Sequence, residues 1–306
     1  MKLFILLMFA LVTVQTFSQT AKQYYQKADS FYSKNDYEAA LQQINLALEK
    51  EPSGYKLLLL KGNAHDYLGQ YQEAFEAYTK MIKLFPEDPV PLSQRAVLLS
   101  KVQEPEHAIV DLDRALKLNN PDSVKITLYI NRGASKIQIR QFDGAYNDFM
   151  QAYALDSLNI GTLNNLASVC DEVGKGDKTL YYLNRILAID SAFIGAYGNI
   201  GFKYQEMGDY TTAIKYFDKV LSLQPDEPLG FSNRAFNKYK LGEFKSALAD
   251  INRSIALYPA NSYAFRTRAL IYIGMKKLAA ACPDLDEAIR LGFPKMYGPE
   301  VDDLKK

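Results

Sequence analysis

The sequence predicts an all-α fold in which one helical hairpin is repeated eight times along the chain. The first observation is a period, because the chain aligns with itself in steps of 34 residues, as from Ala21 to Tyr55. The second is a pair of small residues in every repeat, which allows two helices to cross closely. The third is the spacing of the large apolar residues, which follows the turns of amphipathic helices and shows no strand alternation.

Residues 1–18 differ from the repeats and have the pattern of a signal peptide. The apolar stretch 3–14 is shorter than the ~20 residues that a membrane-spanning helix needs. Thr16 and Ser18 supply small residues for a cleavage site. We therefore expect cleavage after Ser18 rather than a retained anchor. The mature chain is expected to have no stable membrane span and to be periplasmic or extracellular.

Eight repeat units are expected over residues 20–292. They begin near Ala21, Tyr55, Pro89, Ile126, Ile160, Ile194, Pro228 and Ser262. One step is 37 residues long, and its three extra residues fall around 121–125. An insertion costs little in a connection between hairpins, so we place the extra residues there.

Small residues occupy two positions of every unit. Position 8 holds Ala28, Gly62, Ala96, Gly133, Ala167, Gly201, Ala235 and Ala269. Position 20 holds Ala40, Ala74, Ala108, Ala145, Thr179, Ala213, Ala247 and Ala281. Large groups recur at position 24, namely Ile44, Tyr78, Leu112, Phe149, Leu183, Phe217, Ile251 and Leu285. Positions 8 and 20 are therefore expected where the two helices of a hairpin cross, with position 24 in the core.

Turn and break residues separate the helices of each unit. Five units carry residue types at position 15 that accept the left-handed conformation ending a helix: Asn35, Gly69, Gly174, Gly208 and Gly242. Four units carry proline at position 32, where it stops the second helix: Pro52, Pro86, Pro225 and Pro259. Each unit is therefore predicted to contain a helix, a tight turn, a second helix and a break.

These columns resemble the tetratricopeptide repeat, which also has a small residue at position 8, alanine at 20 and proline at 32. The stretches 61–74 and 199–213 are close to the family pattern. The resemblance implies a right-handed superhelical α-solenoid of eight helical hairpins, whose concave face is lined by the first helix of each unit. Units 3, 5 and 8 depart most, with Gln103, Thr179 and Lys276 where the family has glycine, alanine and glycine.

An arginine and an aspartate change together along the repeats. Position 7 is arginine and position 23 is aspartate in the same four units, which pair Arg95 with Asp111, Arg132 with Asp148, Arg234 with Asp250, and Arg268 with Asp284. Because such coupled changes indicate contact, we predict a bond between the two helices of each of these hairpins. Its repetition at one spacing favours a structural pair over a functional site, and desolvation offsets much of its attraction.

The composition offers little for catalysis or for charge-driven binding. Lys and Arg number 36 against 35 Asp and Glu, so no nucleic-acid or anionic-membrane partner is expected. His65 and His107 lack companions at metal or triad spacing, so no metal or cofactor is expected. Cys170 and Cys282 fall three units apart, too far for a disulfide, and are expected to be small buried hydrophobes. We therefore predict that the protein is not an enzyme.

The resemblance implies that positions 2, 5, 9, 12 and 13 of each unit face the concave groove. Toward the C-terminus these positions hold a ridge of large apolar groups with aromatic and polar neighbours: Phe202, Phe236, Leu270, Gln205, Tyr239, Tyr263 and Arg266. Toward the N-terminus they hold Tyr25, Asp29, Tyr32, Lys56, Asn63 and Asp66. An exposed ridge of this kind is typical of a peptide or protein groove. The alternative is that position 9 is partly buried against the neighbouring unit.

The ends of the array need polar caps, because a terminal unit exposes a face that a neighbour would otherwise cover. Lys22, Gln23, Gln26 and Lys27 are expected to supply one cap. Residues 293–306 are expected to form a short lid, or a docking edge for another protein.

Three functions remain open on these observations. The first is a non-enzymatic scaffold or adaptor that binds a protein or peptide in its concave groove, in the cell envelope or outside the cell. The second is a structural component of an envelope assembly that uses its convex face and its ends. An enzyme is a distant third.

Overall fold

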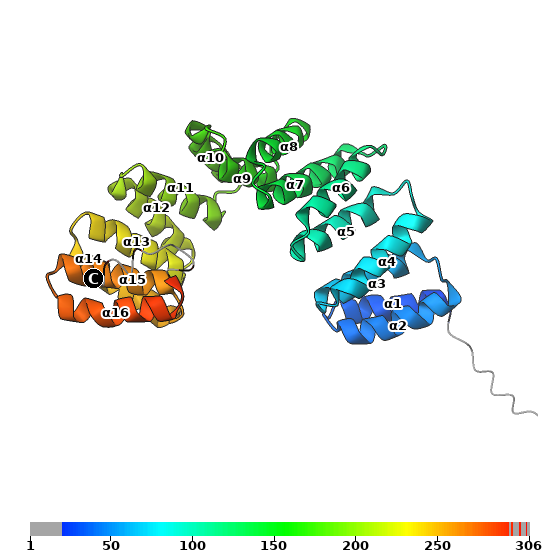
Figure 1. The fold of residues 1–306 in the computed structure, drawn as a ribbon, viewed down its shortest axis with the longest axis horizontal. Helices are drawn as coiled ribbons and strands as arrows, with labels where there is room; N and C mark the ends of the chain where they lie inside the picture. The colour runs from blue at the N-terminus through cyan, green and yellow to red at the C-terminus, as the bar shows by residue number, and fades with distance from the viewer. Residues whose placement is uncertain (1–19, 294, 296–299, 301–303, 305–306) are drawn as a thin grey trace, which may run out of the picture. The chain divides into compact units, whose positions relative to one another are not determined.

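Helical hairpins make up the part of the chain that the computed structural model describes, which is residues 20–293 together with 295, 300 and 304 (Figure 1). The α-helices are α1 (Ala21–Tyr32), α2 (Tyr37–Lys50), α3 (Tyr55–Tyr67), α4 (Tyr71–Leu84), α5 (Pro89–Lys101), α6 (Pro105–Leu116), α7 (Asp122–Gln138), α8 (Phe142–Leu155), α9 (Ile160–Val169), α10 (Thr179–Ile189), α11 (Ile194–Glu206), α12 (Tyr210–Leu223), α13 (Pro228–Lys240), α14 (Phe244–Leu257), α15 (Ser262–Gly274) and α16 (Leu278–Arg290). A short 3-10 turn, η1 (Gly176–Lys178), precedes α10. The described residues contain no strand, and the predicted all-α solenoid of helical repeats is confirmed.

The predicted signal peptide at 1–18 and most of the predicted tail at 293–306 lie outside the described residues. Among the helices that are described, none combines the length and the apolar character that passage through a bilayer requires. The four predicted N-terminal cap residues Lys22, Gln23, Gln26 and Lys27 are all exposed on α1.

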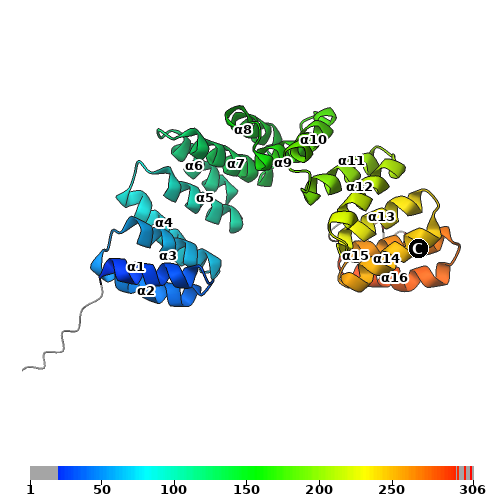
Figure 2. The same ribbon diagram turned by 180° about the vertical axis from the view of Figure 1, so that it is seen from behind.

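The chain divides into two compact units, Met1–Gln141 with α1 to α7 and Phe142–Lys306 with α8 to α16. Within each unit the two helices of a hairpin pack together, as α1 packs on α2 and α13 on α14. The second helix of one hairpin then packs on the first helix of the next, as α12 does on α13. Figure 2 shows the same succession of helices from behind. The right-handed superhelical winding of the array stays a prediction.

The insertion in the fourth repeat lies in a helix. Seven first helices begin at the residue that the repeat register gives, but α7 begins at Asp122, ahead of Ile126. Placing the extra residues 121–125 in a connection is therefore wrong. Pro121 is the N-cap, and the backbone N–H groups of residues 124 and 125 bond its carbonyl at 3.0 and 3.1 Å. Proline at a helix entry loses no hydrogen bond, so the added residues continue as helix and lengthen α7.

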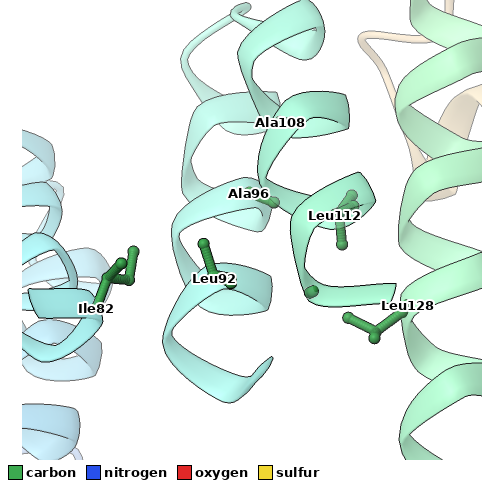
Figure 3. Packing of buried hydrophobic residues seen from close by; sticks show 7 residues of the cluster. Ile82, Leu92, Ala96, Ala108, Leu112 and Leu128 are labelled. Atoms are coloured by element: carbon green, nitrogen blue, oxygen red, sulfur yellow. The ribbon is translucent and has the colours of Figure 1, made fainter. Parts of the chain in front are cut away.

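The core is made of small and large side chains that meet between neighbouring hairpins. Every residue at positions 8 and 20 is buried. In the compact unit Met1–Gln141, Ala96 of α5 and Ala108 of α6 lie in one cluster with Leu92 and Leu112 (Figure 3). Ile82 of α4 joins this cluster from the preceding hairpin, and Leu128 of α7 joins it from the following one. Each hairpin therefore completes the core of its neighbours, as stacked repeats require.

The turn inside the hairpins is left-handed at position 15 in all eight units, including three without glycine or asparagine there. Gln103, Arg140 and Lys276 have φ of 63°, 59° and 60°. A side chain in this region costs roughly 1–2 kcal/mol. The departures of repeat units 3 and 8 from the family pattern therefore raise the free energy of the turn but do not change its conformation.

Candidate partner-binding groove

Some first helices of successive hairpins contact one another directly, as α5 contacts α7. In both ribbon views α13 and α15 lie side by side, and α1 contacts α3 in the same way (Figures 1 and 2). We call the surface of α11, α13 and α15 the C-terminal first-helix face, and that of α1, α3 and α5 the N-terminal first-helix face. These two faces carry the residues for which the sequence predicts partner binding.

A groove of about 360 Å³ lies in the C-terminal first-helix face. Phe202 and Tyr263, both predicted for this surface, line it together with Phe217 and Leu229. The side chain of Phe202 is 42% exposed, and Leu229 is exposed as well. Ligand and peptide sites of this size combine apolar walls with a few polar groups. The groove therefore offers an apolar side chain of a partner a place to bind.

Three residues that shape this groove were not predicted from the sequence, although they stand at positions 2 and 5 of their units. Leu229 and Gly195 occupy position 2 of their units, and Gly198 occupies position 5. A Cβ atom placed on Gly198 would meet nothing within 4 Å. Because glycine has no side chain, Gly198 keeps the groove open. The sequence could have indicated this, since a glycine at a position that faces the groove leaves space there.

Position 9 does not form the uniform exposed ridge that the sequence predicts. Phe202 is exposed and Phe236 is half-buried, whereas Leu270 is 7% exposed. Assigning Leu270 to the exposed partner-binding surface is therefore wrong, because its side chain is buried. The ring of Phe236 lies 6.2 Å from those of Tyr239 and Tyr263, so the partly buried alternative describes Phe236 as well.

The polar groups beside this ridge take part in packing. Gln205 of α11 accepts a hydrogen bond from Nδ2 of Asn237 on α13 at 2.7 Å. Tyr239 is half-buried with its ring 6.2 Å from that of Phe244. Arg266 lies on the face but is 9% exposed and pairs with Glu300, so its expected exposure is wrong. These residues hold the face in position, and the open apolar surface is Phe202 and Leu229.

The N-terminal first-helix face holds a cluster of tyrosines around a carboxylate. The ring of Tyr32 lies 5.2 Å from that of Tyr37 and 6.0 Å from that of Tyr67, and the latter two stack at 4.9 Å. Burial, together with the neighbouring Tyr67, raises the pKa of Tyr32 to about 12. Asp66 accepts a hydrogen bond from Nζ of Lys101 at 2.6 Å. Sequence analysis missed Tyr67 and Lys101, although both stand at position 13 of their units.

Asn63 belongs to the same cluster, since its Oδ1 accepts a hydrogen bond from the hydroxyl of Tyr78 at 2.7 Å. Burial raises the pKa of Tyr78. Tyr25 is half-buried on α1, and Asp29 and Lys56 are exposed. The structure thus brings Tyr32, Asn63 and Asp66 together and leaves the other predicted residues of this end on the periphery.

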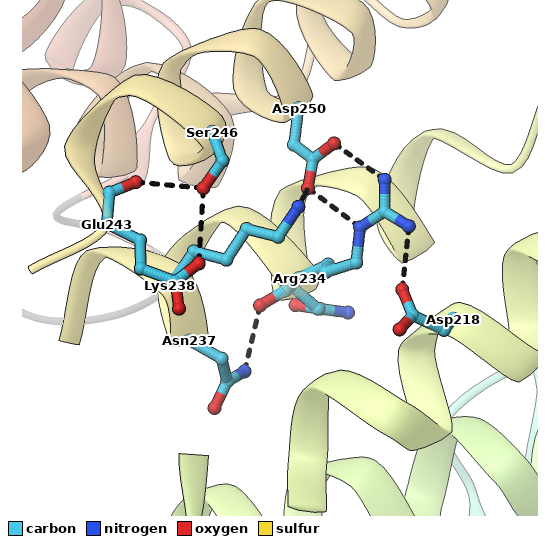
Figure 4. A network of polar contacts seen from close by, with 8 residues as sticks. Asp218, Arg234, Asn237, Lys238, Glu243, Ser246 and Asp250 are labelled. Carbon is cyan, nitrogen blue, oxygen red and sulfur yellow. Dashed lines mark hydrogen bonds and ion pairs between the residues drawn. The ribbon is translucent and has the colours of Figure 1, made fainter. Parts of the chain in front are cut away.

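Three of the four predicted arginine–aspartate pairs are present. Nε and Nη2 of Arg234 donate to the two carboxylate oxygens of Asp250 at 2.7 and 2.6 Å (Figure 4). The same bidentate bond joins Arg95 to Asp111 and Arg268 to Asp284. The fourth pair, Arg132 and Asp148, would join the first compact unit to the second, and it stays a prediction.

Each of these three arginines also bonds the preceding hairpin, which the sequence analysis missed. The Nη1 atoms donate at 2.8 to 2.9 Å to acceptors at position 25 of the preceding unit: Thr79, Asp218 and Asn252. Lys61 makes the corresponding bond to Asn45 at 3.0 Å. Each of these three arginines at position 7 therefore connects three helices. The sequence could have indicated these bonds between hairpins. Whenever position 7 of these units is a cation, position 25 of the preceding unit is a hydrogen-bond acceptor.

A larger cavity of about 600 Å³ lies in the first unit between α4, α5 and α6. Its walls include three exposed apolar residues, Tyr71, Val102 and Val110, the last of them 65% exposed. Nδ1 of His107 lies 2.6 Å from Oε2 of Glu104 in the same wall. This cavity was not predicted from the sequence, because its residues on α4, α5, α6 and the turn at 102–104 stand outside the columns that point to the groove.

The cysteines differ in their surroundings. Cys170 is buried, and burial raises the pKa of its thiol to about 11. Cys282 is exposed, so predicting it as buried is wrong. It follows the buried Ala281, and a step of one residue on a helix turns the side chain by about 100° away from the core. Both thiols are free, and no cluster of three or more possible metal ligands occurs in the described part of the chain.

Two profiles of the tetratricopeptide repeat match the sequence, over residues 25–89 and 195–227. Both stretches fall on hairpins whose helices have the small residues, left-handed turn and packing described above. These two matches support a protein of the tetratricopeptide repeat family. Its repeats support a general role as a protein-binding scaffold.

Relatives of this tetratricopeptide repeat protein match parts of it. RNA polymerase II-associated protein 3 of Xenopus tropicalis is 29% identical over 113 residues, which are 37% of this chain and 17% of that protein. The TPR repeat-containing thioredoxin TDX of Arabidopsis thaliana is 36% identical over 96 residues, 31% of this chain and 24% of that protein. The match thus spans about a fifth of these relatives.

A solved structure is similar in fold across most of the array. In the APC/C hetero-tetramer Cut9–Hcn1, one chain is 17% identical and superposes with a TM-score of 0.63. The similarity covers 92% of this chain and 54% of that chain. At this identity the likeness concerns the helical fold alone.

Proposed function

We propose that the chain is a non-enzymatic scaffold that binds a protein or peptide on the C-terminal first-helix face of its repeats. The observation that carries this proposal is the groove of about 360 Å³, where Phe202 and Leu229 are exposed on packed helices. Exposed apolar groups gathered in a groove mark a surface that a partner covers. The pattern of residues 1–18 supports the further proposal that the protein acts in the cell envelope or outside the cell.

The test replaces the two aromatic side chains of position 9 in the groove region together. A chain with Phe202→Ser and Phe236→Ser should capture its partner from cell-envelope extract at least about tenfold less well than the unchanged chain, because burial of each phenylalanine contributes roughly 1.5–3 kcal/mol. Far-ultraviolet circular dichroism should stay the same, since neither side chain belongs to the buried core. In that extract the mature chain should begin at Gln19.

A matched control removes two exposed apolar side chains from the other cavity. A chain with Tyr71→Ser and Val110→Ser should keep its partner, because both residues lie away from the first-helix faces. If the control loses the partner while the groove variant keeps it, the proposed groove is wrong.

That reversed outcome would favour a second function, a structural component of an envelope assembly. The observation behind it is the cavity of about 600 Å³ with the exposed side chains of Tyr71, Val102 and Val110. A partner would then dock between α4, α5 and α6 and leave the C-terminal first-helix face unused.

A further inference from the structure

Arg266 is a buried cation on the C-terminal first-helix face. It is 9% exposed, and its guanidinium carbon lies 5.3 Å from the ring centroid of Phe236, 5.8 Å from that of Tyr263 and 6.0 Å from that of Phe293. Aromatic faces attract a guanidinium group and stack on its plane. The rings therefore hold Arg266 in one orientation, but they do not neutralise its charge.

The counter-ion comes from a residue that follows the last hairpin. Nε of Arg266 donates to Oε2 of Glu300 at 3.1 Å, and Nη2 donates to Oε1. The side chain of Glu300 is 47% exposed, whereas that of Arg266 is 11% exposed. In the three bidentate pairs within hairpins the aspartate is itself buried and stands on the neighbouring helix. Arg266 is thus fixed within the repeats, while its carboxylate partner is exposed and lies outside them.

Tyr263 joins this cation to the apolar groove. Its ring is one of the three around Arg266, and it also lines the groove together with Phe202. Asn261, in the same wall, is buried. Its Oδ1 accepts a hydrogen bond from the backbone N–H of Ala264 at 3.2 Å, while its Nδ2 has no hydrogen-bond partner in the structure. A cation that needs a carboxylate and a cavity that fits an apolar group therefore lie next to each other.

We propose that this surface binds a peptide segment that carries an acidic side chain close to an apolar one. The carboxylate of the peptide pairs with Arg266, and its apolar side chain enters the groove. In the absence of the peptide, Glu300 pairs with Arg266 in its place. This inference rests on the proposed function, because it names the chemistry of the partner for the same face. A side-chain carboxylate is the matching group, since Glu300 itself binds through its side chain.

Exchange of one carboxylate for another keeps a buried cation paired throughout binding. An unpaired Arg266 would be costly, because removal of one partner leaves an uncompensated buried charge. A group on the same chain competes at an effective concentration on the order of millimolar. Glu300 should therefore weaken the binding of any acidic peptide in trans, and its removal should strengthen that binding.

The experiment measures peptide affinity with the full-length chain by fluorescence anisotropy. The probe is a labelled peptide with the sequence of residues 298–304, blocked at both ends, which carries both Glu300 and Leu304. The Kd should be at least about tenfold lower for the Glu300→Ala chain than for the unchanged chain, because the cis competitor is gone. Glu300→Gln, which keeps the side-chain volume, should act in the same direction. Glu287→Ala removes a partly exposed carboxylate that pairs with Arg290 on α16 and should leave the Kd unchanged.

Two further probes identify the source of the carboxylate. The same peptide with its three acids replaced by their amides should not bind, and an amide version with a free C-terminal carboxylate should not bind either. Equal affinity of the unchanged and Glu300→Ala chains would overturn the proposal, as would binding of either amide peptide. If a Phe202→Ser chain, in which the rings around Arg266 are kept, loses its partner while Glu300→Ala alters nothing, the groove is used without the Arg266 site. If the Phe202→Ser, Phe236→Ser chain keeps its partner, the proposed function itself is wrong.

Discussion

At the scale of single residues, position 24 decides whether position 8 is glycine or alanine. The three glycines, Gly62, Gly133 and Gly201, stand in the units whose position 24 is aromatic, and the five alanines accompany isoleucine or leucine. A Cβ on Gly62 would lie 2.4 Å from Cε1 of Tyr78, and a Cβ on Gly201 would lie 2.9 Å from Cζ of Phe217. The glycine therefore makes room for a ring on the second helix. This coupling is visible in the sequence, but only the contact gives its reason.

Gly201→Ala should destabilise the protein by about 1 kcal/mol. The added methyl group overpacks a buried ring, which costs about 1–3 kcal/mol, while alanine returns up to about 1 kcal/mol of helix propensity. Phe217→Leu in the same chain recreates the alanine and leucine pair of units 3, 5 and 8. Urea unfolding of the single and double variants should show a favourable coupling of about 1 kcal/mol. Strictly additive effects would contradict the steric explanation.

At the scale of helices, the cations at position 7 tie one hairpin to the next. Arg234 of α13 bonds Asp250 of α14 and also Asp218 of α12. The hydrogen bond that Arg234 donates to Asp250 raises the pKa of Arg234 further above the usual range, and the bond to Asp218 adds to the effect. These bonds join elements that the hydrophobic core already brings together, and they specify which helices meet.

The pairs differ in whether the aspartate keeps another hydrogen-bond donor when its arginine is removed. Asp250 also accepts a hydrogen bond from Nζ of Lys238 at 2.8 Å, whereas Asp284 pairs with Arg268 alone in the described residues. Arg268→Met should therefore destabilise the protein by about 3 kcal/mol, and Arg234→Met by roughly half as much, because an unpaired buried carboxylate is costly. Thermal unfolding followed by circular dichroism measures both. Equal losses, or an unchanged melting temperature, would show that the pairs do not act as proposed here.

At the scale of the whole molecule, many of the 22 tyrosines are packed among helices. Burial raises the pKa of Tyr32 to about 12 and also raises the pKa values of Tyr55, Tyr78 and Tyr182. These hydroxyls bury well while neutral and poorly when ionised. The tyrosines thus stabilise both compact units only while they keep their protons.

Stability should consequently fall at high pH. An unfolded tyrosine loses its proton near pH 10, whereas these folded ones retain theirs to about pH 12 or beyond. Between these values the unfolded chain binds fewer protons than the folded chain, so the free energy of unfolding decreases as pH rises. Melting temperatures should decline from pH 10 to 12 more steeply than from pH 7 to 9. A flat profile through pH 12 would contradict the raised pKa values.

The outcome for particular residues shows what sequence patterns can and cannot reach. The starts of seven first helices follow from repetition, because the same residue types recur at the same positions of eight units. The arginine–aspartate pairing follows because the two residues occur together in four of them. The insertion at 121–125 occurs once, and no column tells whether it is loop or helix. Leu270 and Arg266 fail for a related reason. The column gives the direction of a side chain, but its exposure depends on which residues, such as Glu300, lie over it.

The order of amino acids alone was sufficient for the hairpin, its turn and its helical faces, since these depend on contacts between residues about 16 apart, such as the arginine–aspartate pairs, that recur along the repeats. Tertiary packing decided the rest: the groove opened by Gly198, the cavity beside Val110, and the carboxylate on Arg266. Each of these is a single arrangement made by several helices. Burial and open space depend on every neighbour at once, so they appear only when the helices are packed.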